Sequence, residues 1–177
     1  MLFSDGGKAV RFDENDVRPL GRAARGVRGM MLEDGQSVIA MLVAEDETQS
    51  VLTATENGYG KRTSITEYTR HGRGTKGMIA IQQSERNGKV VAATLVHADD
   101  EIMLITDKGV LVRTRVSEIR ELGRATQGVT LIALDEGSKL SGLQRIVEND
   151  ANVTDAEADG DASPDSGTSS APEAPDA

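Results

Sequence analysis

The chain has 177 residues, of which 29 are acidic and 20 basic, giving a formal charge of −9. It has no cysteine and only two histidines, which excludes disulfides, thiol nucleophiles and cysteine-ligated zinc and argues against a multi-histidine metal site. The longest apolar run, residues 38–44, is far shorter than the roughly 20 residues of a membrane helix, and the first residues do not follow the pattern of a signal peptide. We expect a cytoplasmic chain without metal, cofactor or membrane contact.

An internal repeat of 51 residues runs through the chain. Gly7, Gly58 and Gly109 are spaced by 51 residues, and each is followed four residues later by an arginine. Further along each copy, a glycine-bounded segment reads GRAARGV, GRGTKGM or GRATQGV. Repetition at such a period is typical of solenoids and propellers. We expect three repeats, at residues 1–50, 51–101 and 102–148.

Short apolar runs within each copy predict β-strands rather than helices. In the third copy the expected strands are residues 102–106, 110–116, 129–134 and 139–147. Dipeptides such as Asn57-Gly58 and Asn87-Gly88 separate the runs and predict tight turns. Residues 116–122 are expected to be extended rather than helical. Four strands per copy predict an all-β, propeller-like fold.

Three blades are fewer than the four to eight with which propellers close. We therefore expect three four-stranded blades of a larger closed ring, within a longer protein, with a small open solenoid as the alternative.

The last 29 residues, 149–177, form an acidic tail. They contain eight acidic residues, no basic residue and three of the four prolines. Such a segment buries too little apolar surface to order itself, so we predict that it is disordered. One hypothesis is that this tail competes with DNA for a basic surface, and the alternative is a tail that only aids solubility.

Positive charge is concentrated in the same part of every repeat. Residues 6–28, 57–79 and 108–130 contain 16 basic and 6 acidic residues, a net +10, whereas the rest of the first 148 residues carries −11. Arginine makes up 14 of the 20 basic residues, which suits bidentate phosphate contacts, while four aromatic residues are too few to stack single-stranded bases. The pattern predicts a curved basic belt that contacts the backbone of bent duplex DNA without reading its sequence.

The candidate DNA contacts are basic side chains at or beside the repeated arginine positions. They are, on or next to expected strands, Arg11, Arg62, Arg113 and Arg115, and, in the glycine-bounded loops, Arg22, Arg25, Arg73, Lys76 and Arg124. For the repeated strand arginines the alternative is an ion pair with an acid of the neighbouring repeat. The loop cations are the stronger candidates, because glycine lets backbone amides approach a phosphate.

Several other motifs do not predict a site. Residues 72–77 match the GxGxxG dinucleotide pattern, but they lead into the strand-like residues 78–81 instead of a helix. Residues 99–101, Asp-Asp-Glu, fit a solvated turn better than a cation site. His71 and His97 have no partners that suggest a catalytic constellation, so nothing in the chain predicts catalysis.

The glycine-bounded segments, together with NGYGKRT at 57–63, LVRTRVSEI at 111–119 and GLQR at 142–145, closely resemble the C-terminal domain of the bacterial DNA gyrase A protein. The resemblance covers residues 1 to about 148 and implies a β-pinwheel, usually of six blades, that wraps duplex DNA around its basic rim. The gyrase A box, Gln-Arg-Arg-Gly-Gly-Lys-Gly, is absent, and residues 71–77 keep only Arg73, Gly74, Lys76 and Gly77 of it. This departure leaves the corresponding domain of topoisomerase IV as an alternative.

The resemblance also implies partners. In the whole enzyme, a heterotetramer of two gyrase A and two gyrase B chains introduces negative supercoils with ATP hydrolysis, and the chain would be associated with the chromosome. The catalytic tyrosine and the ATP and magnesium sites of this family lie in other domains, so this chain alone should neither cleave DNA nor hydrolyse ATP. An interaction scaffold that binds an acidic protein through the same rim is the alternative from a different class.

Overall fold

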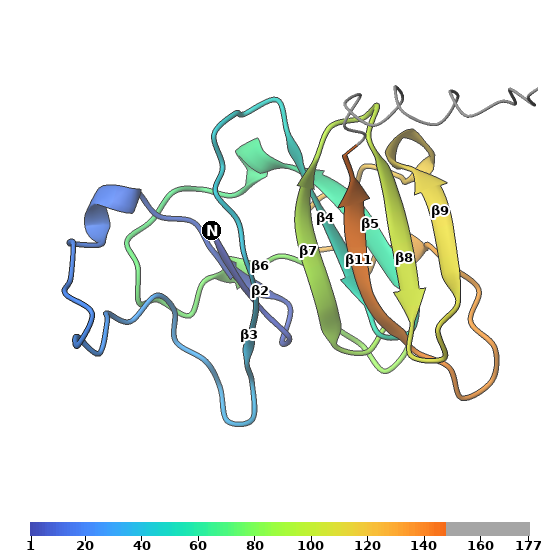
Figure 1. Ribbon diagram of the computed structural model, residues 1–177, viewed down its shortest axis with the longest axis horizontal. Helices are drawn as coiled ribbons and strands as arrows, with labels where there is room; N and C mark the ends of the chain where they lie inside the picture. The colour runs from blue at the N-terminus through green and yellow to red at the C-terminus, as the bar shows by residue number, and fades with distance from the viewer. Residues whose placement is uncertain (148–177) are drawn as a thin grey trace, which may run out of the picture. The chain divides into compact units, whose positions relative to one another are not determined.

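The computed structural model describes residues 1–147, which fold into three antiparallel sheets (Figure 1). In spatial order, the first sheet contains β3 (Val38–Met41), β1 (Leu2–Ser4), β2 (Lys8–Val10) and β6 (Met78–Ile79). The second contains β10 (Val129–Thr130), β5 (Tyr59–Ser64), β4 (Ser50–Thr55) and β7 (Val90–Val96). The third contains β11 (Leu140–Ile146), β8 (Glu101–Thr106) and β9 (Leu111–Arg115). The predicted all-β fold is confirmed, and the predicted disordered tail lies outside the described residues.

The sheets exchange strands between repeats. The second and third repeats each supply four strands, as predicted, but the third strand of each lies in the sheet of the preceding repeat. Thus β6 extends the first sheet, with Met78 opposite Ala9, and β10 extends the second, with Val129 opposite Gly60. Within the described residues the third sheet keeps three strands. The exchange links consecutive sheets through their backbones as well as through their side chains.

Glycine is required at the hairpin turns for steric reasons. Gly58 has a φ of 80°, and a Cβ there would lie 2.6 Å from the carbonyl oxygen of Ile132, which belongs to the next repeat. Its counterparts Gly7 and Gly109 have φ values of 75° and 81°. Only glycine adopts this left-handed conformation without strain, so the 51-residue spacing of these glycines marks one turn in each repeat.

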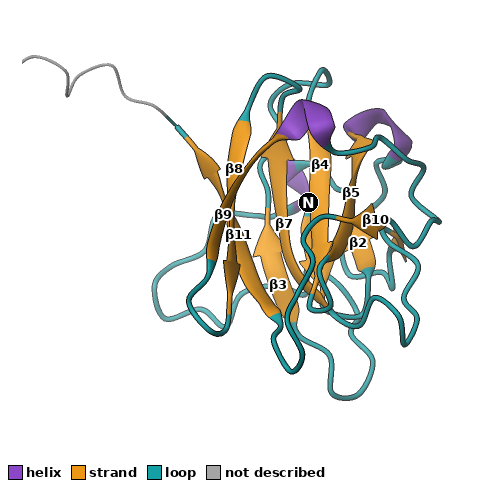
Figure 2. Cartoon of the chain, turned by 90° about the vertical axis from the view of Figure 1, so that its right-hand side faces the viewer, coloured by secondary structure: helices purple, strands orange, loops and turns teal. Residues whose placement is uncertain are grey.

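A short 3₁₀ helix follows the second strand of each repeat (Figure 2). These helices are η1 (Glu14–Asp16), η2 (Ile65–Glu67) and η3 (Val116–Glu118). The prediction that residues 116–122 are extended is therefore wrong for the first three, because the amide of Ile119 donates to the carbonyl of Val116 at 3.0 Å and closes a turn. Among residues 1–147, no helix is long and apolar enough to cross a membrane.

Two apolar clusters hold the sheets together. One cluster lies between the first and second repeats, at what we call the first junction. It includes Phe3 and Tyr68, whose rings meet edge to face with their centroids 6.0 Å apart. The other joins the second and third repeats, the second junction, and includes Leu52 and Leu104. Each cluster takes side chains from two consecutive repeats, so each repeat depends on a neighbour to bury its apolar surface.

Candidate nucleic-acid interface

A basic loop follows each 3₁₀ helix, and we define the three loops as residues 17–28, 68–77 and 119–128. The second and third loops lead into the exchanged strands β6 and β10. Each of the three loops contains one of the glycine-bounded segments. Gly77 has a φ of 74°, and a Cβ there would lie 2.3 Å from the carbonyl oxygen of Ala9. A Cβ on Gly128 would likewise lie 2.7 Å from the carbonyl oxygen of Gly60. These glycines therefore let the loop approach the preceding sheet. The loop at 72–77 leads into strand β6, as predicted, and not into the helix that a dinucleotide site needs.

The repeated loop arginines tie the second and third basic loops to the preceding repeat. Arg73 donates from Nε to the carbonyl of Asp16 at 2.9 Å and from Nη1 to that of Arg28 at 3.2 Å. Arg124 donates from Nη1 to the carbonyl of Ile79 at 2.8 Å, which is the same contact one repeat later. Arg22, their counterpart in the first repeat, is exposed and has no such bond within the described residues.

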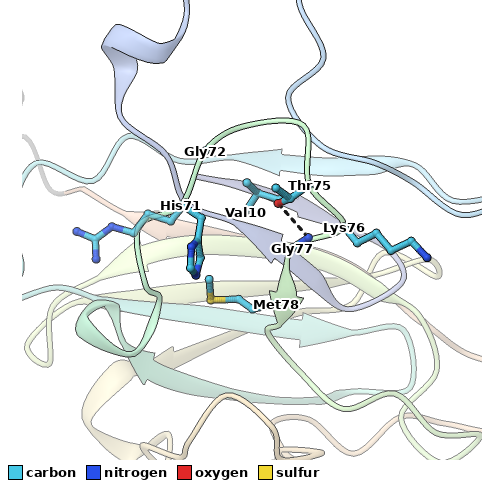
Figure 3. A pocket seen from close by; sticks show the side chains of 8 residues that line it. Val10, His71, Gly72, Thr75, Lys76, Gly77 and Met78 are labelled. Carbon is cyan, nitrogen blue, oxygen red and sulfur yellow. Dashed lines mark hydrogen bonds between the residues drawn. The ribbon is translucent and has the colours of Figure 1, made fainter.

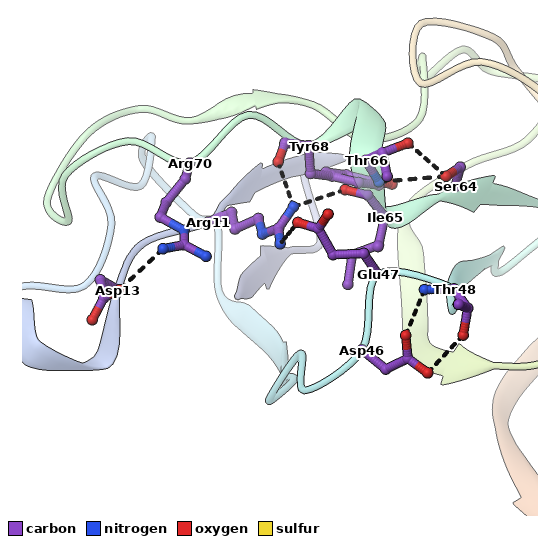
Figure 4. Close-up of polar contacts among 10 residues, drawn as sticks. All are labelled: Arg11, Asp13, Asp46, Glu47, Thr48, Ser64, Ile65, Thr66, Tyr68 and Arg70. Carbon is purple, nitrogen blue, oxygen red and sulfur yellow. Dashed lines mark hydrogen bonds and ion pairs between the residues drawn. The ribbon is translucent and has the colours of Figure 1, made fainter.

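The strand arginines Arg11 and Arg62 also act between repeats, and Figure 4 shows the contacts of Arg11. Arg11 Nη1 donates to the carbonyls of Ile65 and Tyr68, both at 3.1 Å, and its Nη2 lies 3.2 Å from a carboxylate oxygen of Glu47. Its side chain is only 10% exposed. The guanidinium group of Arg11 is therefore engaged inside the protein and is not available to contact DNA.

Arg62 repeats this arrangement at the second junction. Its Nε donates to the carbonyl of Ile119 at 2.8 Å, and its Nη1 lies 3.6 Å from Glu121. Glu121 belongs to the neighbouring repeat, so the alternative ion pair predicted for these arginines is present here. Arg113 pairs with Glu101 on the adjacent strand, and Arg115 lies 3.8 Å from the same carboxylate with its side chain 71% exposed.

A further set of basic side chains in the loops is exposed. Within the described residues, no hydrogen bond or ion pair engages these side chains, here called the free cations: Arg18, Arg22, Arg25, Arg28, Lys76 and Arg120. Four of the six belong to the first basic loop. Arg18, Arg28 and Arg120 were not among the candidates from sequence, and their positions are not basic in all three repeats. Clustered guanidinium groups without acidic partners create a surface suited to phosphate.

Arg73 and Arg22 allow a matched test, because the Arg73 side chain binds the preceding repeat whereas Arg22 is one of the free cations. We expect Arg73→Gln to lower the free energy of unfolding by about 1 kcal/mol, because two backbone carbonyls lose a charged donor. Arg22→Gln should change it by less than about 0.5 kcal/mol, since it removes no contact within the described residues. Urea unfolding followed by circular dichroism measures both, and equal effects would contradict the assignment.

Lys61 is a buried cation that sequence reasoning missed. It lies on β5 with no exposed surface, and its Nζ donates to the carbonyls of Gly123 and Arg124 in the third basic loop. Burial lowers the pKa of Lys61 to about 8. The signal in the sequence was a lysine at a position where the other repeats have valine, Val10 and Val112.

This pKa predicts how stability varies with pH. A lysine in the unfolded chain has a pKa of about 10.4, so between about pH 8 and that value the unfolded state binds more protons than the folded state. The free energy of unfolding should therefore rise with pH in this window for the wild type relative to Lys61→Met. Denaturant unfolding of both proteins at a series of pH values measures the difference, and a difference that does not change with pH would contradict the prediction.

A cavity of about 370 Å³ lies at the first junction, beside the second basic loop. Its lining includes Val10, which occupies the position of Lys61 and offers no donor to the carbonyls of Gly72 and Arg73. Figure 3 shows His71 and Lys76 on opposite sides of this cavity. Basic side chains make this lining more suitable for an anion than for a cation.

The three sheets exchange strands, share apolar cores with their neighbours and carry basic loops. These features define a propeller-type repeat domain with a polycationic surface. The chain belongs to the DNA gyrase C-terminal domain family, because the family model described as "DNA gyrase C-terminal domain, beta-propeller" matches residues 1–45, 49–97 and 100–146. The family expected from the sequence is thereby confirmed.

Sequence relatives include the DNA gyrase A proteins of Pseudomonas aeruginosa, 54% identical over 148 residues, and of Escherichia coli K12, 53% identical over 148 residues. These matches cover 84% of this chain but only 16 and 17% of the relatives. Among solved structures, a DNA gyrase A C-terminal domain matches with a TM-score of 0.75 and 30% identity, over 82% of this chain and 50% of that one. A topoisomerase IV C-terminal domain matches with a TM-score of 0.77 and 25% identity, over 82% and 45%.

Proposed function

We propose that this chain binds duplex DNA through the free cations and bends it across consecutive repeats. The observation that carries the proposal is the first basic loop, where four exposed arginines have no hydrogen bond or ion pair within the described residues. Lys76 and Arg120 belong to the second and third basic loops, which repeat the first loop along the sequence, and we expect them to extend the same contact. Successive phosphate contacts can offset the cost of bending, which is of order 1 to 6 kcal/mol for 40 to 90° over 20 to 30 bp.

The proposed mode is contact with the DNA backbone. Three of the loop cations predicted from the sequence are the primary DNA contacts: Arg22, Arg25 and Lys76. The other two, Arg73 and Arg124, act mainly by holding the loops in place. Arg113 and Arg115 are secondary candidates, because they share the carboxylate of Glu101. Arginine contacts to phosphate oxygens fix position without reading bases, so binding should tolerate any sequence.

We further propose that the whole protein is a gyrase A protein that works with a second copy of itself and two gyrase B proteins in DNA supercoiling near the chromosome. The 54% identity to a gyrase A protein supports this, although the chain spans only about 16% of that relative. DNA cleavage, ATP hydrolysis and the ATP and magnesium sites are assigned to other parts of the enzyme. The topoisomerase IV alternative has less support, given 25% against 30% identity to the two solved domains.

Ring closure of a short DNA tests the bending. A linear duplex of about 150 bp, close to one persistence length, is ligated with and without the chain. The proposal predicts faster circle formation at subsaturating protein, little affected when the DNA sequence is shuffled. Unchanged ring closure at protein concentrations that occupy the DNA would contradict bending, and no occupancy at low salt would favour the scaffold alternative.

A further inference from the structure

The cavity at the first junction has a filled counterpart at the second junction. In the 51-residue repeat, Val10 corresponds to Lys61 and Gly72 corresponds to Gly123. At the second junction, the side chain of Lys61 reaches the third basic loop, where its Nζ donates to the carbonyl of Gly123. At the first junction, Val10 is too short to reach the second loop, and Val10 and Gly72 line the cavity of about 370 Å³. The space that a lysine side chain fills at one junction is therefore open at the other.

The basic loops differ in the opposite sense. His71 and Lys76 in the second basic loop correspond to Leu122 and Gln127 in the third. The junction with a buried lysine thus has uncharged loop residues at these two positions, whereas the junction with a valine has two basic ones. Both basic side chains line the cavity, are exposed, and make no hydrogen bond or ion pair within residues 1–147. No acidic residue belongs to the lining, so nothing there neutralises their positive charge.

Thr75 adds a hydroxyl group that is not committed to the protein. Its counterpart in the third loop, Thr126, donates this hydroxyl to the carbonyl of Gly123 at 2.9 Å. Thr75 makes no such bond within the described residues, and its Oγ1 only accepts from the amide of Gly77 at 3.3 Å (Figure 3). The hydroxyl hydrogen of Thr75 is therefore available to an acceptor in the cavity.

The cavity combines apolar and polar surfaces. Val10 and Met78 contribute apolar side chains, whereas His71, Thr75 and Lys76 contribute hydrogen-bond donors. In Figure 3 the ring of His71 points toward Met78, and Lys76 extends away from the cavity on the other side. A lysine side chain is flexible, so its ammonium group can turn to an anion at the mouth. The volume of about 370 Å³ is near the lower end of the range for small-molecule sites.

We propose that this cavity binds a phosphate group through Lys76, His71 and Thr75, and that phosphate from solution competes there with a phosphate of DNA. Phosphate is a compact anion with several acceptor oxygens, which suits a lining that offers donors and no carboxylate. The site uses side chains of a loop that leads into a strand, so it differs from a dinucleotide site at a helix. The competition rests on the proposed function, in which Lys76 contacts DNA, whereas the phosphate site itself does not.

Nuclear magnetic resonance of the full 177-residue chain, titrated with inorganic phosphate, tests the site without DNA. Phosphate replaces chloride up to about 50 mM at constant ionic strength and pH, so that screening stays the same and only the anion changes. The amide signals of residues 71–78 should shift and reach saturation, while those of residues 122–129, where Lys61 fills the corresponding space, should not. Equal shifts in both loops, or shifts that do not saturate, would overturn the proposal.

Three variants identify the groups that bind phosphate. Val10→Lys reproduces the second junction and should abolish the shifts, because its ammonium group would occupy the cavity. Lys76→Gln should raise the phosphate dissociation constant by about fivefold, and it keeps the test decisive if circular dichroism shows that Val10→Lys does not fold. Lys108→Gln makes the same change in net charge in the third repeat, where Lys108 contacts the carbonyl of Glu136, and should leave the dissociation constant unchanged. Equal effects of the two glutamine variants would overturn the proposal.

Duplex DNA affinity then distinguishes the two sources of the phosphate group. A duplex of about 40 bp is titrated in chloride and in phosphate at equal ionic strength, with fluorescence anisotropy as the readout. The wild type should bind DNA about threefold more weakly in phosphate, since one phosphate contact is lost, whereas Lys76→Gln should bind equally in both salts. Unchanged wild-type affinity while phosphate occupies the cavity would overturn the competition and assign the site to phosphate from solution alone. DNA binding in chloride tests the proposed function separately, so the two failures can be told apart.

Discussion

Replacing Arg18, Arg22, Arg25 and Arg28 together by glutamine is expected to weaken duplex DNA binding by about 10²- to 10³-fold at 0.1 M salt. Each phosphate contact contributes about 0.9 to the slope of log affinity against log salt, so the slope should become shallower by up to about 3.6. The fold should be unaffected, because the four side chains make no hydrogen bond or ion pair within the described residues. Fluorescence anisotropy with a labelled duplex across salt concentrations measures both quantities.

A control with the same change in net charge separates these arginines from charge in general. Lys89, Lys108, Lys139 and Arg145 lie outside the free cations and contact acidic side chains or carbonyls. Their joint replacement by glutamine should lower DNA affinity by less than about tenfold, because distant surface charges are screened beyond a Debye length. Equal losses in the two quadruple variants would show that the first basic loop has no special role.

Arg11→Met is expected to lower the free energy of unfolding by about 3 kcal/mol, the largest stability effect that we predict for a single substitution. The buried carbonyls of Ile65 and Tyr68 would lose their donor, and each such acceptor costs about 1 to 3 kcal/mol when left unpaired. Because these carbonyls belong to the second repeat, the substitution loosens the first junction. Urea unfolding followed by circular dichroism measures the change.

Arg115→Met is the matched control for Arg11→Met. The Arg115 side chain is 71% exposed and lies 3.8 Å from its acidic neighbour, so its loss should cost less than about 0.5 kcal/mol. If Arg11→Met lowers the free energy of unfolding no more than Arg115→Met does, the contacts of Arg11 across the first junction add nothing to stability.

The 51-residue repeat predicted the number of sheets and the turn glycines, but it did not predict the strand exchange. Periodicity identifies which residues are equivalent, and it carries no information about which copy they pair with. Val129 and Met78 are strand residues in both arrangements, and only the approach of Gly128 and Gly77 to the preceding sheet decides between them.

The basic residues of the loops have two different roles, and only one of these roles requires the same position in each repeat. Arg73 and Arg124 recur because every junction needs the same hydrogen bond to a carbonyl of the preceding repeat. The free cations Arg18 and Arg28 are not basic in every copy, since a flexible polyanion does not require them at identical positions. Lys61 was missed because a lysine in a strand is usually exposed, whereas here two backbone carbonyls bind its ammonium group.

The most direct test of the central claim is the affinity of this chain for a duplex of about 40 bp, titrated across salt. If about six phosphates are neutralised, log affinity should fall against log salt with a slope of roughly −5, and shuffling the sequence should leave affinity almost unchanged. A folded chain that does not bind the duplex at about 50 mM salt, or that binds with affinity independent of salt, would contradict the account.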